Sequence, residues 1–352
     1  MTDVPSLQER IAAAAGSRRP LCIRAGGSKD FYGGPPAGEV LDVAALSGIS
    51  HYEPTELVVT ARAGTRLTDL ERALAGHGQM LAFEPPCFEG RATVGGAVAS
   101  GLSGPRRGYR GSVRDHVLGV EMIDGRGQLL RFGGRVIKNV AGFDVSRLMA
   151  GSLGTLGVLT EITLKTVPRP RTECTLAFAL DQPAALEMMT LWATRALPLS
   201  ATAWHDGTLR VRLSGADAAV RAARQSLGGE LLTRADEYWN DVRGQRLDFL
   251  QPTQELWRVS LPANSPPLPI EGRTLIEWGG SLRWLPGERD GAALHALAAR
   301  LGGHAMLYRG PRKPPEGCFQ PLPPAMLALH QRLKAVFDPY RICNRGRLHP
   351  DL

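Results

Sequence analysis

The stretch that decides the fold is residues 151–161, which read G-S-L-G-T-L-G-V-L-T-E. Its first half is glycine-rich, and glycines permit turns and a close approach of other backbone segments or ligands. Residues 158–166 then alternate apolar and polar side chains, which predicts a strand with one buried face. The stretch therefore predicts a tight, glycine-built turn that leads into a closing strand of a sheet.

Other glycine-rich segments lie in the same half of the chain. The first follows a short apolar strand, the second is long, and the third begins ahead of residues 151–161. The first segment reads R-A-G-G-S-K at 24–29. The second runs from Pro85-Pro86 through T-V-G-G-A-V-A-S-G-L-S-G at 93–104 to Y-R-G-S-V-R-D at 109–115. The third reads K-N-V-A-G-F-D at 138–144. A pyrophosphate needs several N–H donors, and glycine lets its oxygens come close. Together these segments favour a site for a long anionic ligand over plain glycine turns.

Length and composition indicate how many domains to expect and whether the chain spans a membrane. The chain has 352 residues, of which 43% are hydrophobic and 22% are charged, with a formal net charge of +8. This length suggests about two domains with real cores. No apolar run approaches the roughly 20 residues that span a bilayer, and residues 1–16 form an amphipathic helix pattern and not a signal peptide. We therefore expect a cytoplasmic protein.

Motif searches exclude several common classes. The sequence contains no phosphate-loop, zincin, nucleophile-elbow or early Rossmann glycine motif. Five scattered cysteines form no Cys-x-x-Cys pair, and eight histidines show no ligand spacing, so we expect no metal or iron–sulfur cluster on this chain. A basic cluster at Arg106, Arg107, Arg110 and Arg114 has few aromatic residues nearby, which favours a solvated or partner-facing loop over a nucleic-acid site.

The clearest domain boundary is V-P-R-P-R at 167–171, because its prolines end the preceding strand. We expect domains at 1–170 and 171–320, with a helix and tail at 321–352 that return to the first domain. In the first domain the pattern predicts strands at 21–24, 39–42, 49–52, 57–61, 117–123, 128–132 and 158–166 and helices at 67–75 and 94–100. In the second it predicts strand 172–179, helix 184–195, strands 200–205 and 208–213, helix 216–227 and a strand at 230–232. That order is the split βαββαβ unit of a ferredoxin-like sheet.

A less complete repeat of this unit follows. Its strands are expected at 256–261, 274–278, 281–285 and 304–307, with a helix at 290–301 and proline-rich connections at 262–269 and 311–324. A last helix is expected at 324–337. The predicted class is therefore α+β, with two subdomains in the first half and a short α+β cap.

The motifs carry a family resemblance. Residues 21–29, 85–124 and 136–168 resemble the FAD-binding domain of the vanillyl-alcohol oxidase type, also called PCMH-type, which occurs in D-lactate and glycolate dehydrogenases. The ending F-D-P-x-x-I-x-N-x-G-R at 337–347 also resembles that family's ending. The resemblance covers about half of the chain and implies FAD bound in extended form between two α+β subdomains.

The resemblance also implies the residues that contact FAD. Arg24, Ala25, Gly26, Gly27 and Ser28 would hold the pyrophosphate; Gly95, Gly96, Ser100, Gly101 and Gly104 would line the path to the flavin; and Gly151, Thr155, Gly157 and Val158 would pack around the adenosine. The same segments add Lys29, Pro86, Thr93, Gly111, Asp115, Ser152 and Gly154 to the expected FAD contacts. Lys29 stands where some relatives carry a flavin-linking histidine, so we expect non-covalent FAD.

Within the family, the short cap, L-S-G-P-R-R-G-Y at 102–109 and N-R-G-R-L at 344–348 resemble the FAD-binding subunits of glycolate oxidases. The resemblance implies two partners, a larger FAD-containing catalytic subunit and an iron–sulfur subunit that passes electrons to quinone. It further implies participation in the oxidation of glycolate, a small 2-hydroxy acid, to glyoxylate. Any membrane contact would then run through the partner subunits, at the inner membrane.

Two other functions stay open. The chain could be a self-contained FAD-dependent D-lactate or 2-hydroxy acid dehydrogenase, or an assembly subunit whose FAD does no substrate chemistry. Arg283, Arg309 and Arg312 in the cap are the candidate anchors for a substrate carboxylate. No catalytic base can be named from the sequence, and the missing histidine pair favours the assembly subunit.

Overall fold

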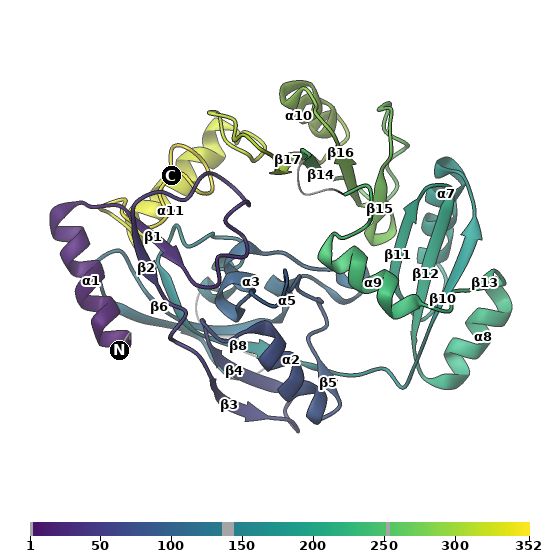
Figure 1. Ribbon diagram of the computed structural model, residues 1–352, viewed down its shortest axis with the longest axis horizontal. Coiled ribbons are helices and arrows are strands. Elements are labelled where there is room, and N and C mark those ends of the chain that lie inside the picture. The colour runs from purple at the N-terminus through teal and green to yellow at the C-terminus, as the bar shows by residue number, and fades with distance from the viewer. Residues whose placement is uncertain (1–2, 136–143, 251–253) are drawn as a thin grey trace.

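The computed structural model describes residues 3–135, 144–250 and 254–352 and forms two α+β lobes (Figure 1). The predicted α+β class is confirmed. The first lobe holds a five-stranded antiparallel sheet in the order β3-β4-β8-β6-β7. These strands are β3 (Ile49–Glu53), β4 (Val58–Arg62), β6 (Val117–Ile123), β7 (Leu129–Gly133) and β8 (Val158–Lys165). The strand predicted from the deciding stretch is therefore the centre of this sheet.

Helices close one side of this sheet. They are α2 (Leu67–Gly76), α3 (Val94–Ser100), α5 (Val113–His116) and α6 (Val145–Leu148), whereas the short helix α4 (Arg107–Arg110) packs against the cap. The apolar face of α2, formed by Leu67, Leu70 and Leu74, is almost fully buried, as its spacing predicts. A two-stranded pair, β5 (Gln79–Met80) with β9 (Val167–Pro168), connects this lobe to the chain that enters the cap. The predicted boundary at 167–171 falls at this crossing.

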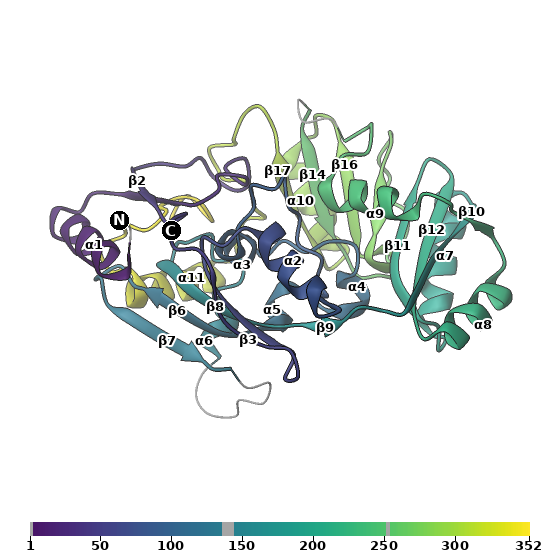
Figure 2. The ribbon, with the colours of Figure 1, turned by 60° about the horizontal axis from the view of Figure 1, so that its bottom comes forward.

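A small parallel pair, β1 (Leu21–Arg24) with β2 (Glu39–Asp42), completes the first lobe. The N-terminal helix α1 (Val4–Ser17) buries Leu7 and Ile11 against this pair. The C-terminal helix α11 (Pro324–Phe337) and the tail after it lie along the same region (Figure 2). The tail residue Cys343 forms a parallel bridge to Leu21, so the two ends of the chain meet at β1.

The cap contains one eight-stranded antiparallel sheet in the order β13-β10-β12-β11-β15-β16-β14-β17. Its strands are β10 (Thr172–Ala179), β11 (Leu199–His205), β12 (Thr208–Gly215), β13 (Glu230–Leu231), β14 (Leu256–Ser260), β15 (Leu275–Glu277), β16 (Leu282–Pro286) and β17 (His304–Arg309). Counted within each half, the strands follow the order 4-1-3-2, which is the ferredoxin-like arrangement. The two predicted units therefore exist, but β11 and β15 join them edge to edge into one sheet.

The cap helices are α7 (Gln182–Ala193), α8 (Asp217–Leu227), α9 (Ala235–Gly244) and α10 (Gly291–Arg300). The second unit has no described helix between β14 and β15, because the connection at 262–269 carries four prolines. Helix α9 was not predicted; its sequence is mostly polar, and only Trp239 and Val242 are buried. No helix in the described part of the chain is long and apolar enough to cross a membrane.

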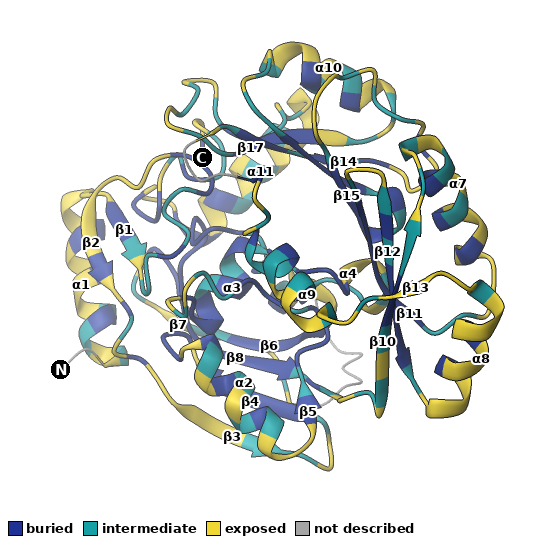
Figure 3. Cartoon of the chain, turned by 45° about the vertical axis from the view of Figure 1, so that its right-hand side comes forward, coloured by how far each residue is buried: buried dark blue, intermediate teal, exposed yellow. Residues whose placement is uncertain are grey.

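The two faces of the cap sheet have different partners. Figure 3 shows α7, α8 and α10 on the outer face, while α9 and the first lobe face the inner side. One core cluster joins Tyr32 and Leu102 of the first lobe to Ala203, Trp284 and Tyr308 of the cap. The lobes are therefore packed through a real apolar interface, and any site between them has fixed walls.

Candidate FAD site

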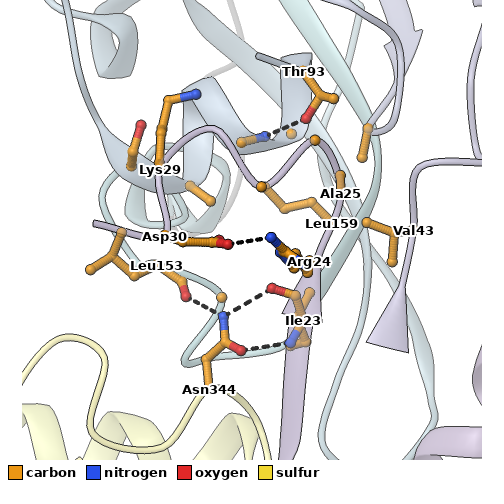
Figure 4. A pocket seen from close by; sticks show the side chains of 18 of the residues that line it. Ile23, Arg24, Ala25, Lys29, Asp30, Val43, Thr93, Leu153, Leu159 and Asn344 are labelled. Atoms are coloured by element: carbon orange, nitrogen blue, oxygen red, sulfur yellow. Dashed lines mark hydrogen bonds and ion pairs between the residues drawn. The ribbon is translucent and has the colours of Figure 1, made fainter. Parts of the chain in front are cut away.

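A cavity lies where the loop after β1 meets α3 and the segment that enters β8 (Figure 4). It brings together residues from three distant parts of the sequence and from the C-terminal tail. The predicted FAD contacts that line it are Arg24, Ala25, Gly26, Gly27, Ser28, Lys29, Thr93, Gly95, Gly96, Ser100, Gly154 and Gly157. The glycine-rich segments thus converge on one site, as expected of a binding site for a long ligand.

The loop after β1 is shaped to hold an anion. A Cβ on Gly26 would stand 1.8 Å from the Arg91 carbonyl oxygen, and Gly27 has a left-handed backbone with φ of 62°. The backbone N–H groups of Gly27, Ser28 and Lys29 find no acceptor among the described residues. Successive free N–H groups in such a turn form a concave anion site. The loop therefore fits a pyrophosphate.

Lys29 supplies a positive charge to the same cavity. Its ammonium lies 5.3 Å from the centre of the Phe88 ring and 3.4 Å from Ser28 Oγ. No carboxylate among the described residues pairs with it, and burial lowers the pKa of Lys29 to about 8. The ammonium also lies 3.7 Å from where a Cβ on Gly96 would stand. A partly buried cation without an acidic partner, beside free N–H groups, is an environment that a phosphate ligand would complete.

Helix α3 has a packing role in addition to lining the cavity. Its first N–H groups already have protein acceptors: Val94 donates to Thr65 O, Gly95 to Ala63 O at 2.8 Å, and Gly96 to Thr93 Oγ1 at 3.2 Å. A Cβ on Gly95 would stand 2.7 Å from the Ala63 Cβ. Gly95 is therefore required for close packing of α3, while Gly96 faces the cavity.

The C-terminal tail forms part of the cavity, and residue-level prediction missed this. Asn344 Oδ1 accepts from the Ile23 N–H at 2.7 Å, and its Nδ2 donates to Leu153 O at 2.7 Å (Figure 4). Arg347 Nη1 donates to Gly34 O at 2.6 Å and also binds the Asp30 carbonyl. The tail thus ties the first loop to the 151–157 segment. The N-x-G-R motif at 344–347 was recognised in the sequence, but the motif alone does not identify the residues that Asn344 and Arg347 contact.

Other predicted FAD contacts lie elsewhere. Gly101 and Gly151 line a neighbouring cavity between the lobes, whereas Pro86, Gly104, Gly111, Asp115, Ser152, Thr155 and Val158 line neither cavity. Several of these residues serve local structure. A Cβ on Gly104 would stand 2.2 Å from Glu84 O, Asp115 caps α5 through Ser112, and the Thr155 hydroxyl donates to Ser152 O. Residues 138–143 of the third segment lie outside the described residues.

Two expectations about arginines are wrong. Arg106 does not lie on a solvated or partner-facing loop: it is 6% exposed and pairs with Glu84 at 2.8 Å and with Glu173. Arg283 is not a carboxylate anchor, because its buried guanidinium donates to Ser265 O and Pro266 O, both at 2.6 Å. Burial lowers the pKa of Arg283 to about 10.

The other candidate anchors differ from each other. Arg309 is partly buried and donates to Leu250 O, which occupies one of its amino groups, and Arg312 is exposed. Neither lines the cavity between the lobes. Within residues 3–135, 144–250 and 254–352, no three His, Cys, Asp or Glu side chains gather as a metal site. None of the three arginines expected to anchor a substrate carboxylate therefore lines the cavity between the lobes.

The fold and the cradle define an FAD-binding protein. Residues 1–133 match the family model described as "FAD binding domain". Over 96% of its length the chain superposes on 73% of alkyldihydroxyacetonephosphate synthase with a TM-score of 0.66, at 15% identity, which shows the shared fold. This confirms the expected FAD-binding fold.

Two curated relatives narrow the family. The chain is 45% identical over 347 residues to glycolate oxidase subunit GlcE of Escherichia coli (strain K12), covering 99% of this chain and 97% of that protein. It is 30% identical over 207 residues to glycolate oxidase subunit GlcD of Bacillus subtilis (strain 168), covering 57% of this chain and 44% of that protein. The chain belongs to the family of glycolate oxidase subunit GlcE, as the sequence resemblance indicates.

Proposed function

We propose that the chain is the FAD-binding subunit of a multi-subunit glycolate oxidase or dehydrogenase that converts glycolate to glyoxylate. The observation that carries the proposal is the match to GlcE over nearly the whole of both chains. The anion cradle at residues 27–29 supports the proposal independently, because its backbone N–H groups lack acceptors among the described residues and can bind the pyrophosphate of FAD.

FAD is held without a covalent bond in this proposal. The N–H groups of Gly27, Ser28 and Lys29 and the Lys29 ammonium bind the pyrophosphate, and Gly154 and Gly157 line the same cavity on the adenosine side. Bound FAD supplies hydride acceptance from an alcohol carbon and release of electrons one at a time. Arg347 and Asn344 hold the cradle in shape from behind.

The partner subunits in this proposal are inferred because the sequence contains no Cys-x-x-Cys motif that could hold an iron–sulfur cluster. Its five cysteines form no Cys-x-x-Cys pair and are free thiols in the structure, three of them buried. A flavin subunit that carries no cluster of its own passes single electrons to another protein. We assign that role to an iron–sulfur subunit, with a larger flavoprotein subunit of the GlcD kind as the third component. Contact with the membrane quinone pool runs through these partners.

A second candidate is an FAD-bearing assembly subunit whose larger partner performs the oxidation. The observation that favours it is the placement of Arg283 and Arg309, which bind backbone carbonyls of the chain itself. The self-contained D-lactate or 2-hydroxy acid dehydrogenase is the third outcome of the same experiment.

The experiment compares the purified chain alone with the chain co-expressed with its partner subunits. Flavin absorbance and glycolate-dependent dye reduction are measured in both samples. Absorbance in the single chain with activity only in the complex supports the proposal. Activity of the chain alone makes it a self-contained dehydrogenase. Full activity of a complex in which Gly27→Asp has removed this flavin makes it an assembly subunit.

A further inference from the structure

A second cavity of about 500 Å³ lies between the lobes and meets the FAD cavity at Ser100. Its walls come from α4 and α5 of the first lobe and from β14, β17 and the turn after β15 in the cap. Four basic side chains line it: Arg107, Arg114, Arg258 and His304. Nothing in the proposed FAD cradle uses these residues.

Two of these arginines lie against one indole. The Arg107 guanidinium is 4.3 Å from the centre of the Trp278 ring, and the Arg258 guanidinium is 5.2 Å from it. Trp278 Nε1 donates to Gly104 O at 3.0 Å, which fixes the ring. An aromatic ring binds a guanidinium through its face while leaving the N–H groups free for another partner. Trp278 thus holds one arginine from each lobe at the cavity.

The Trp278 backbone is strained. Its φ is 56°, in the left-handed region that a bulky side chain rarely adopts. The residue is 5% exposed and is held in a short turn, Trp278–Gly280, against Gly108 of α4. Strain of this kind persists where the surrounding structure enforces it, and it gathers at binding sites. The turn therefore serves the placement of the indole at the cavity.

The described carboxylates offset the positive charge of the cavity only in part: Asp115 acts on Arg107 and Glu277 on Arg258, each without forming an ion pair. No carboxylate among the described residues forms an ion pair with Arg107, Arg114 or Arg258. Burial and the Arg258 charge lower the pKa of Arg107, and burial together with Arg258 and Arg107 lowers that of His304. Like charges brought together this way cost free energy unless an anion joins them.

The nearby acids have other partners. Asp115 accepts from the Ser112 N–H and hydroxyl, both at 2.8 Å, as the cap of α5. Glu277 is buried and accepts from Trp284 Nε1 at 2.7 Å. Burial raises the pKa of Glu277 to about 7, so this side chain carries only part of a negative charge near neutral pH. Neither acid completes the cavity.

We propose that this cavity binds a small carboxylate anion, which Arg107 and Arg258 bind from opposite lobes, while Arg114 adds a third positive charge and His304 a ring nitrogen. The choice of a carboxylate rests on the proposed function, in which the protein handles a 2-hydroxy acid. The anion site itself rests only on the four basic side chains and the strained Trp278. Arginine suits the site because its planar N–H groups match both carboxylate oxygens.

The test titrates oxalate into the purified, FAD-loaded chain by calorimetry. Binding that weakens by about tenfold or more in both Arg258→Met and Arg107→Met supports the site. Arg110→Met is the matched control, because Arg110 is exposed on the same short helix as Arg107 and does not line the cavity. Arg114→Met, at an exposed position, keeps the test valid if a variant at Arg258 does not fold.

The outcomes separate the site from the proposed function. Oxalate binding that is absent, or unchanged in the arginine variants, overturns the carboxylate site and leaves FAD binding intact. Tighter binding of inorganic phosphate than of oxalate also overturns it. If oxalate binding shifts the flavin absorbance, the cavity holds the carboxylate of the 2-hydroxy acid beside the flavin. If oxalate binds without a shift, the cavity holds a carboxylate at a distance from the flavin. Both of these results support the site.

Discussion

Glu84 of the first lobe and Arg212 of the cap form a buried ion pair across the lobe boundary, with 2.8 Å between Oε2 and Nη2. The other Glu84 oxygen accepts from Arg106 Nε at 2.8 Å, and both arginines also approach Glu173 of β10. Burial alone raises the pKa of Glu84, but Arg212 and Arg106 outweigh it and hold that pKa below its ordinary value. Two carboxylates and two guanidiniums therefore fix the cap over the first lobe.

Replacing Arg212 is expected to destabilise the protein strongly. Arg212→Met leaves Glu84 and Glu173 with one guanidinium between them, and breaking a buried pair costs about 3–5 kcal/mol. Unfolding in urea, followed by circular dichroism, measures this loss. Arg131→Met is the control, because Arg131 pairs with Glu121 at the surface, where such pairs contribute about 0–1 kcal/mol. Equal losses in the two variants would contradict the fixed-cap interpretation.

Gly96→Ala is expected to weaken FAD binding while the protein stays folded. Alanine favours the helix, but its Cβ would stand 3.2 Å from Thr93 Oγ1 and 3.7 Å from Lys29 Nζ, on the cavity side of α3. We expect the dissociation constant for FAD to rise about tenfold, equal to about 1.4 kcal/mol. Flavin fluorescence during reconstitution of the FAD-free chain measures it.

Gly16→Ala serves as the matched helix control for Gly96→Ala. Gly16 lies near the end of α1, and a Cβ there meets no atom within 4 Å. This variant should bind FAD like the unchanged chain and gain up to about 1 kcal/mol of stability. Unchanged FAD binding in both variants would place the ligand away from α3.

FAD affinity is expected to fall as the pH rises above about 8. Burial lowers the pKa of Lys29 to about 8 in the empty cradle, and a bound pyrophosphate would raise it again, so binding takes up a proton at higher pH. Below pH 8 the ammonium is already charged and affinity stays level. The Cys87 thiol also acts on Lys29, and burial raises the pKa of this thiol above its ordinary value.

Titrations at pH 7 and pH 9.5 check this prediction. The dissociation constant should rise by about tenfold or more between them. Lys29→Met should bind more weakly at pH 7 and lose the pH dependence, because no charge remains to titrate. If the dissociation constant for FAD still depends on pH in Lys29→Met, another group causes the effect, and the role given to Lys29 is wrong.

The features that the sequence predicted well are local ones. The loop at 24–29, helix α3 and strand β8 follow from glycine placement and from short-range alternation, and the structure brings them to one cavity. The paired ferredoxin-like units also follow from the order of short segments. In each case the information lies within a few residues of the element that it describes.

The features that the sequence did not predict depend on packing between distant segments. Glu84 and Arg212 are 128 residues apart, and Asn344 and Ile23 are 321 residues apart. A buried arginine and an exposed one look the same in a single sequence, which is why Arg106 was expected on a solvated loop. Only the closed interface between the lobes decides which arginines pair and which, like Arg258, face a cavity.

Glu277→Gln is expected to stabilise the protein at alkaline pH and not at acidic pH. Glu277 is buried in the cap, and burial raises its pKa from 4.5 to about 7. The folded state therefore binds a proton that the unfolded chain releases between these values. This contribution is complete below pH 4.5 and is lost as the pH rises through 7. Glutamine keeps an oxygen for the Trp284 N–H, which donates to Glu277 at 2.7 Å, and carries no charge to bury.

Urea unfolding at pH 5 and pH 8 tests this expectation. The Gln variant should lie within about 1 kcal/mol of the unchanged chain at pH 5 and exceed it at pH 8 by about 3 kcal/mol, as the shift in pKa implies. Glu271→Gln is the control, since Glu271 is exposed and should change little at either pH. A gain of the same size at both pH values would mean that Glu277 is ionised throughout. Glu277 would then be a full counter-charge for Arg258, and the cavity would need no anion to balance it.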